Sequence, residues 1–285
     1  MKMKFLITLI VGAIFIFVLS VDVFAFPTIV EHDITNLNLI ESISKFRSGA
    51  GHDYSYSSSA ETDPTETDRS MKHYFQPYLA DIGTNSTIPI FAPFSGVIIS
   101  VSTEQHILLN GEHGGKQVWV VPNGYGFGDP DTYTVGLFHV NLDDRFPQSL
   151  NSNAGEPNDT TYVTKNIIAG ELLGYADLRP DGRNFDIAVS HILSPSETHL
   201  ISYFDIMPDS LFANYQARGV SDRDELIISK EYRDANPVGA QWGQYNPDDW
   251  VVLNSPSNSV PEPATMLLFG LGGVGMAFIR GKRKA

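Results

Sequence analysis

The sequence contains no cysteine, which excludes disulfide bonds and thiolate metal sites along all 285 residues. Any zinc site must therefore use histidine and carboxylate ligands. Basic residues are also few, since 19 Lys and Arg stand against 33 Asp and Glu and leave a net charge of -14. A surface of that sign repels nucleic acid, so we expect no nucleic-acid partner. The sequence also lacks a G-x-S-x-G motif and a P-loop, which disfavours serine hydrolysis and nucleotide chemistry.

Residues 1–25 have the three-part layout of a signal peptide. Lys2 and Lys4 precede an uncharged apolar run over 5–21, and the small residue Ala25 predicts cleavage directly after it. We therefore expect export through the Sec translocon. The apolar run is long for a cleaved signal, so retention as an N-terminal anchor stays open.

The C-terminal segment 256–285 contains Pro261, Glu262 and Pro263, an apolar stretch over 264–279 and a basic cluster at its end. The prolines prevent a helix from continuing back into the preceding domain. The apolar stretch predicts a short transmembrane helix, and the basic cluster holds its far end on the cytoplasmic side. Taken alone, these parts also describe an ordinary membrane anchor.

The order of these C-terminal parts resembles the PEP-CTERM sorting signal. The resemblance implies recognition by an exosortase, a membrane transpeptidase-like enzyme of Gram-negative bacteria that make exopolysaccharide. It implies processing near the Pro-Glu-Pro motif after transient anchoring in the inner membrane, and delivery to the cell surface or the extracellular matrix. Such a tail specifies a destination and not an activity.

Between the terminal segments, short runs rich in Val, Ile and aromatic residues alternate with turn residues, which predicts a mainly β protein with an antiparallel core. The clearest runs are 88–102, 116–123, 133–142 and 184–192. A hairpin is expected over 163–177, with its turn at Gly170.

Helical patterns follow Pro195, over 208–219 and over 221–237, where Ser221 is expected to cap the second helix. Residues 242–253 read as one more strand against the core. We therefore divide the body into a lead-in over 26–48, a β domain over 49–194 and a smaller helical appendage over 195–255.

The β region resembles the LytM or lysostaphin-type zinc endopeptidases, which carry the duplicated hybrid motif. GAGHDY at 49–54 resembles their H-x-G-x-D-Y motif, the strand at 133–142 resembles the one that holds a functional histidine, and NFDIAV at 184–189 stands in place of their H-x-H strand. The resemblance implies an antiparallel sheet of the barrel-sandwich hybrid type, with a groove.

On that pattern the ligand aspartate falls on Asp53 and the functional histidine on His139, while two of the three ligand histidines are missing. Three protein ligands are needed for catalytic zinc, so the resemblance implies a largely non-catalytic relative that needs no cofactor. A zinc set of His52, Asp53 and Asp186 stays open, although neighbours on an extended strand point to opposite faces. A catalytic role for His139 also stays open.

We therefore predict an exported surface protein whose β domain binds a peptide, a glycan or a matrix component. The alternatives are a zinc-dependent endopeptidase acting on peptidoglycan or surface proteins, and a purely structural matrix protein. Aromatic residues in a groove favour glycan binding by stacking on sugar faces, and the candidates are Tyr54, Tyr56, Tyr74 and Trp119. The basic residues within 69–75 are expected to form a solvated patch above packed aromatic side chains.

Overall fold

The structure, a computed structural model, describes residues 26–55, 66, 68–104, 115–126, 128–148, 161–179, 184–239 and 246–256. The predicted signal peptide, the Pro-Glu-Pro motif and the predicted transmembrane helix lie outside these ranges. Within the ranges, no helix is both long and apolar enough to cross a membrane.

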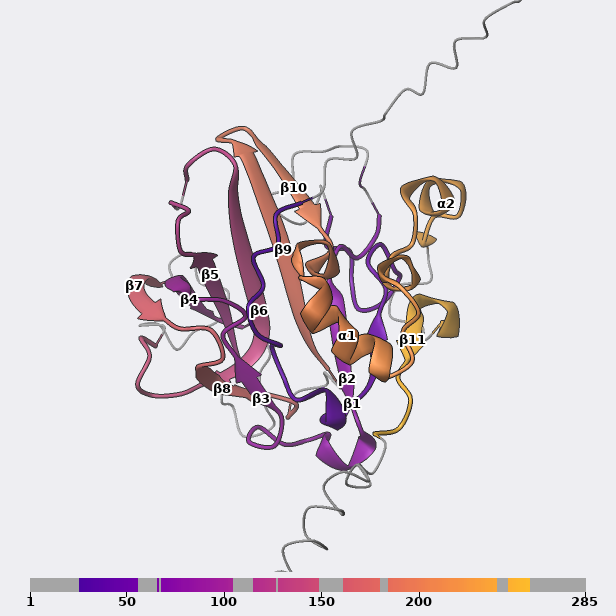
Figure 1. Cartoon of the computed structure of the whole chain (residues 1–285), viewed down its shortest axis with the longest axis horizontal. Coiled ribbons are helices and arrows are strands. Elements are labelled where there is room, and N and C mark those ends of the chain that lie inside the picture. The colour runs from indigo at the N-terminus through magenta and orange to yellow at the C-terminus, as the bar shows by residue number, and fades with distance from the viewer. Residues whose placement is uncertain are drawn as a thin grey trace, which may run out of the picture.

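Eleven strands form one antiparallel sheet in the described part of the chain (Figure 1). The strands are β1 (Ile40–Ser44), β2 (His73–Pro77), β3 (Pro89–Phe91), β4 (Gly96–Thr103), β5 (Lys116–Pro122), β6 (Thr132–Leu142), β7 (Thr161–Ile167), β8 (Leu172–Ala176), β9 (Phe185–Ser194), β10 (Glu197–Ile201) and β11 (Trp250–Val252). The main path runs β11-β1-β2-β9-β6-β5-β4-β7, while β10 pairs with β9, and β8 pairs with β6 and β3. The path does not return on itself, so the described strands make an open sheet. The predicted mainly β, antiparallel fold is confirmed.

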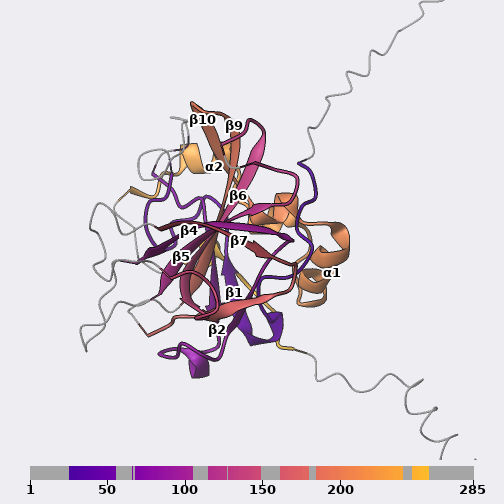
Figure 2. The ribbon, with the colours of Figure 1, turned by 90° about the vertical axis from the view of Figure 1, so that its left-hand side faces the viewer.

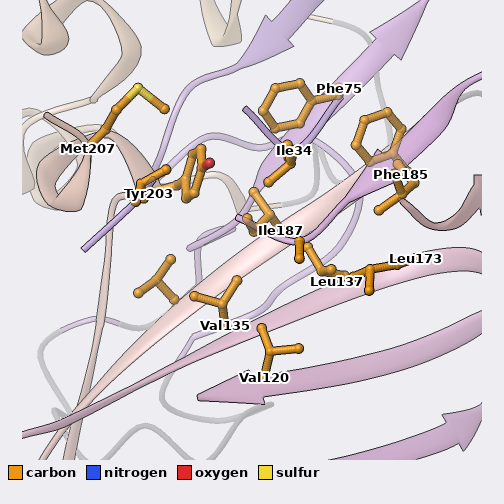
Figure 3. Close-up of a cluster of buried hydrophobic side chains, with 14 of the residues drawn as sticks. Ile34, Phe75, Val120, Val135, Leu137, Leu173, Phe185, Ile187, Tyr203 and Met207 are labelled. Carbon is orange, nitrogen blue, oxygen red and sulfur yellow. The ribbon is translucent and has the colours of Figure 1, made fainter. Parts of the chain in front are cut away.

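The strands alternate between apolar residues that enter the core and residues that point to the opposite face. On β6, Val135 and Leu137 enter the core, and on β9 Ile187 and Val189 join them. Figure 3 shows Val135, Leu137 and Ile187 among the side chains of this cluster. Each fully buried side chain of this kind contributes about 1.5–3 kcal/mol, so the core fixes the register of the strands. The residues in the other phase are thereby held on a second face.

The helices are short. They are α1 (Asp209–Ala217) and α2 (Lys230–Ala235), with 3-10 turns at Leu37–Leu39, Leu79–Asp81, Tyr203–Ile206, Arg223–Leu226 and Pro247–Asp249. Phe212 and Tyr215 of α1 are buried in the same cluster as the strands.

The regions expected to flank the β domain contribute strands of their own. Residues 195–255 include both helices, but β10 and β11 as well. Within 26–48, β1 pairs with β11 on one side and β2 on the other. The described parts of both regions therefore share the sheet and the core of the β domain.

The predicted helix over 221–237 is divided in two by an extended stretch. The 3-10 turn after Asp222 ends at Leu226, and α2 begins only after Ser229, which caps it. Between them, the carbonyl of Leu226 accepts a hydrogen bond from Phe46, and the amide of Ile228 donates to Phe46. This pairing holds the chain extended, so the prediction of one continuous helix was wrong.

The predicted hairpin around Gly170 was also wrong in its pairing. Gly170 does adopt a positive φ of 75° between β7 and β8, but β7 pairs with β4, and β8 pairs with β3 and β6. The intervening residues bond instead to Ala92, which accepts from the amide of Gly170 and donates to the carbonyl of Glu171. With the turn bonded to Ala92, β7 and β8 do not pair with each other and each pairs with other strands.

Candidate functional site

A row of paired residues crosses five strands on the face of the sheet opposite the core. Tyr162 of β7 pairs with Ser100 of β4, Ser100 with Trp119 of β5, Trp119 with Gly136 of β6, and Gly136 with Ala188 of β9. Directly paired residues point to the same face, so these five form one row. Figure 2 looks toward the end of the sheet at which β4, β5 and β7 lie. Tyr162 is 76% exposed there, and Trp119 is half-buried.

Gly136 provides the space that the Trp119 indole occupies. A β-carbon on Gly136 would lie 2.9 Å from Cη2 of Trp119 and 3.0 Å from Cε2 of Phe138. Phe138 meets Trp119 edge to face at a centroid distance of 5.8 Å, and Tyr54 at 5.7 Å. We refer to Tyr54, Trp119 and Phe138 as the aromatic cluster. The absence of a side chain at position 136 is therefore a condition for the packing of this cluster.

Four charged side chains adjoin the aromatic cluster, and we refer to Lys72, Asp186, His139 and Glu104 as the charge network. Nζ of Lys72 lies 2.7 Å from Oδ2 of Asp186, and Oδ1 of Asp186 lies 3.2 Å from Nε2 of His139. Nδ1 of His139 lies 2.5 Å from Oε2 of Glu104. Nζ of Lys72 also lies 3.5 Å from the centre of the Phe138 ring, which is a cation–π contact. The two positive and two negative charges cancel.

Hydrogen bonds and neighbouring charges outweigh the effect of burial on the protonation states of His139 and Asp186. Burial would lower the pKa of His139, but its hydrogen bonds to Asp186 and Glu104 and their negative charges raise that pKa to about 10. Burial would likewise raise the pKa of Asp186, but the ammonium of Lys72 and the imidazolium of His139 hold it well below its usual range. A histidine that faces a carboxylate through each nitrogen donates twice and is positively charged. At neutral pH, His139 is therefore an imidazolium.

A break in strand alternation brings Phe138 and His139 to the same face. Leu137 and Val140 both enter the core, so the two residues between them both point away from it. The backbone at His139 is left-handed, with φ 58°, which is uncommon outside glycine. Its amide donates to Oε1 of Glu104 at 2.7 Å, and its carbonyl accepts from the amide of Asp177 at 2.6 Å. These bonds hold the irregular backbone that joins the aromatic cluster to the charge network.

Two members of the network, Lys72 and Glu104, are not among the zinc and catalytic residues predicted from the sequence. Lys72 belongs to the stretch 69–75, which was expected to form a solvated basic patch, but Arg69, Lys72 and His73 are all buried. Burial also lowers the pKa of His73 to about 4, a shift that a hydrogen bond with the Ser44 carbonyl only partly offsets. The patch prediction was wrong because these cations have carboxylate partners inside the structure, Glu66 and Asp234 for Arg69 and Asp186 for Lys72. The one sign in the sequence that Lys72 is buried was its position two residues before Tyr74, in the same phase of alternation, directly ahead of a strand.

The residues predicted for zinc are only partly brought together. Asp186 lies between Lys72 and His139. Oδ1 of Asp53 instead accepts from the Ser55 hydroxyl at 2.5 Å, and the ring of the exposed His52 contacts the carbonyl of Asp53. Among the described residues, no group of three or more histidine and carboxylate side chains is placed to hold a metal ion. The zinc set and a catalytic His139 stay predictions.

The four aromatic candidates for glycan binding have different environments. Tyr54 and Trp119 lie in the aromatic cluster, and both are half-buried. Tyr74 is buried, and Tyr56 lies outside the described residues. Tyr162, the most exposed aromatic residue of the row, was not predicted. Its alternation with Thr161 and Val163 in an aromatic and β-branched run was a usable signal.

Comparison with known proteins identifies one family feature. The family model of the PEP-CTERM protein-sorting motif matches residues 259–284, which include the Pro-Glu-Pro motif. No family match or curated relative supports the LytM-type resemblance of the core, and no curated protein matches the chain. The motif indicates processing by an exosortase and export to the cell surface.

Proposed function

We propose that this exported protein is a non-catalytic surface protein that binds a glycan through the row Tyr162–Ser100–Trp119. Passage through the Sec translocon, cleavage after Ala25, transient anchoring through 264–279 and release to the cell surface or matrix are part of the proposal. The single observation that carries the binding role is the row itself, in which the exposed Tyr162 and the half-buried Trp119 lie on either side of the buried Ser100 on paired strands.

Aromatic rings suit sugars because the flat C–H face of a pyranose packs against a π-system. Tyr162 presents most of its side chain to solvent, and Trp119 is held by Gly136 and Phe138. A ring that is already fixed loses little conformational freedom when it binds. The fixed position of the Trp119 ring therefore favours a role in ligand binding.

The charge network supports a binding role over a catalytic one. A general base must accept a proton near neutral pH, but His139 keeps its proton up to a pKa of about 10. Both carboxylates of the network face the imidazolium, and Asp186 also faces Lys72. The network thus serves to support Phe138 and its neighbours.

The test measures affinity of the full-length protein, in detergent, for a panel of polysaccharides by affinity electrophoresis and calorimetry. Trp119→Ala and Tyr162→Ala are each expected to weaken binding by about 1–3 kcal/mol, by analogy with the loss found when an aromatic side chain that stacks on a nucleobase is replaced by alanine. Tyr232→Ala is the matched control, because Tyr232 is 58% exposed on α2, away from the row. A protein that binds no glycan saturably, or equal losses in all three variants, would refute the proposal and favour a purely structural role.

A further inference from the structure

The geometry points to an uncharged, extended polysaccharide as the ligand of this face, lying across the strands. This inference rests on the proposed function and adds the chemical class of the glycan. It comes from the distribution of charge over β4, β5 and β7 and from the spacing of the exposed Tyr162 ring and the half-buried Trp119 ring.

No charged side chain shares the phase of the row on these three described strands. The residues in that phase are Val97, Ser100, Ser102, Gln117, Trp119, Val121, Tyr162, Thr164 and Asn166, as the strand pairing and alternation define them. Hydroxyl and amide groups both donate and accept hydrogen bonds, as the hydroxyl groups of a neutral sugar require. Ser100, Ser102 and Val121 are buried, so the accessible part of this face consists of the other six residues, which are uncharged although the chain has 33 acidic residues.

The lysines of the same strands occupy the opposite phase. Lys116 pairs with Thr103, and Lys165 pairs with Ile98, which is fully buried in the core. Neither lysine is therefore in phase with the rings of the row. The charge network beside the aromatic cluster is neutral as a whole, so it offers no net charge to an anionic ligand.

The rest of the molecule disfavours polyanions. Residues 26–255 carry 13 basic and 31 acidic residues, since six basic and two acidic residues lie in the terminal segments. A polyanion that approaches the row meets this negative field within about one Debye length, roughly 8 Å at physiological salt. A neutral chain meets no such barrier.

The spacing of the rings sets the size of the ligand. Tyr162 and Trp119 are both paired with Ser100, from opposite sides of β4. Two strand spacings separate them, which is about 10 Å. A single sugar does not span that distance, so a ligand that contacts both rings is an oligomer or polymer that crosses the strands.

The experiment compares neutral glucan, mannan, galactan and xylan with the carboxymethylated form of each, at low and high salt, using the full-length protein in detergent. We expect saturable binding to at least one neutral polymer, unchanged by salt, and binding about tenfold weaker to its carboxymethylated form at low salt. Trp119→Ala and Tyr162→Ala should each weaken the neutral interaction about tenfold. Tyr162 is exposed, so its variant keeps the test informative where the tryptophan variant does not fold. Thr164→Lys, which adds a positive charge beside the row, should selectively improve binding of the carboxymethylated form.

The outcomes separate the two claims. Equal or tighter binding of a carboxymethylated polymer, still weakened by Trp119→Ala or Tyr162→Ala, overturns the inference about charge and leaves the proposed function intact. No saturable binding to any polymer, or binding that neither variant changes, overturns both. Salt-sensitive binding of the anionic forms that the ring variants do not alter is non-specific and also counts against both.

Discussion

Replacing Lys72 with methionine removes the ammonium that faces the buried carboxylate of Asp186. Methionine keeps most of the side-chain volume, so the change is chiefly electrostatic. The two side chains are 4% and 0% exposed, and their charged atoms lie 2.7 Å apart. Removing one partner of such a pair costs about 3–5 kcal/mol, because the other charge stays buried. His139 still faces Asp186, so we expect a loss near the lower end, about 3 kcal/mol in the free energy of unfolding.

Urea unfolding at neutral pH measures this loss, and a double-mutant cycle assigns it. Lys72→Met should cost much less in an Asp186→Asn background, because the carboxylate is then neutral. Lys116→Met is the control, since Lys116 is only half-buried, and we expect less than about 1 kcal/mol for it. A loss below about 1 kcal/mol for Lys72→Met, or additive losses in the cycle, would show that the pair does not stabilise the fold.

Three further predictions concern the same region. Gly136→Ala introduces a β-carbon 2.9 Å from the Trp119 ring, so we expect a loss of about 1–3 kcal/mol and a shifted tryptophan fluorescence spectrum; an unchanged spectrum and stability would contradict the packing described. The stability that protonated His139 contributes should be complete below its ordinary pKa of 6.5 and be lost as the pH rises to about 10, a decline that urea unfolding should detect in the wild type and not in His139→Gln. Because Asp186 already faces two cations, purified protein should hold no stoichiometric zinc by plasma emission, and one zinc per chain that Asp53→Ala removes would restore the endopeptidase alternative.

The strand content was predictable because it depends on local signals. Runs such as 133–142 combine β-branched and aromatic residues with turn residues at their ends, and β6 occupies nearly that range. The partners of the strands were not predictable in the same way. The hairpin expected around Gly170 would pair two strands that are adjacent in the sequence. In the structure, Gly170 and Glu171 instead form backbone hydrogen bonds with Ala92, far earlier in the chain.

The site was predictable only in part, because its residues come from distant segments. Trp119 and Tyr54 were identified as aromatic candidates, and their sequence positions give no sign that Phe138 lies between them. His139 and Asp186 were identified through a family resemblance. The cation with the largest effect on Asp186 is Lys72, whose ammonium is enclosed by the Tyr54 and Phe138 rings from distant parts of the chain.

The pairing of β1 with β11 has a consequence for the order of events during secretion. Ser42 is matched with Val252, so a chain that emerges N-terminus first exposes one edge of β1 until almost all of the domain has been translocated. Unpaired strand edges invite association with other chains. The sorting motif begins at residue 259, so the last strand and the recognition signal for the exosortase emerge almost together. In an export that begins at the N-terminus, completion of the sheet and exposure of the sorting motif would therefore be nearly simultaneous.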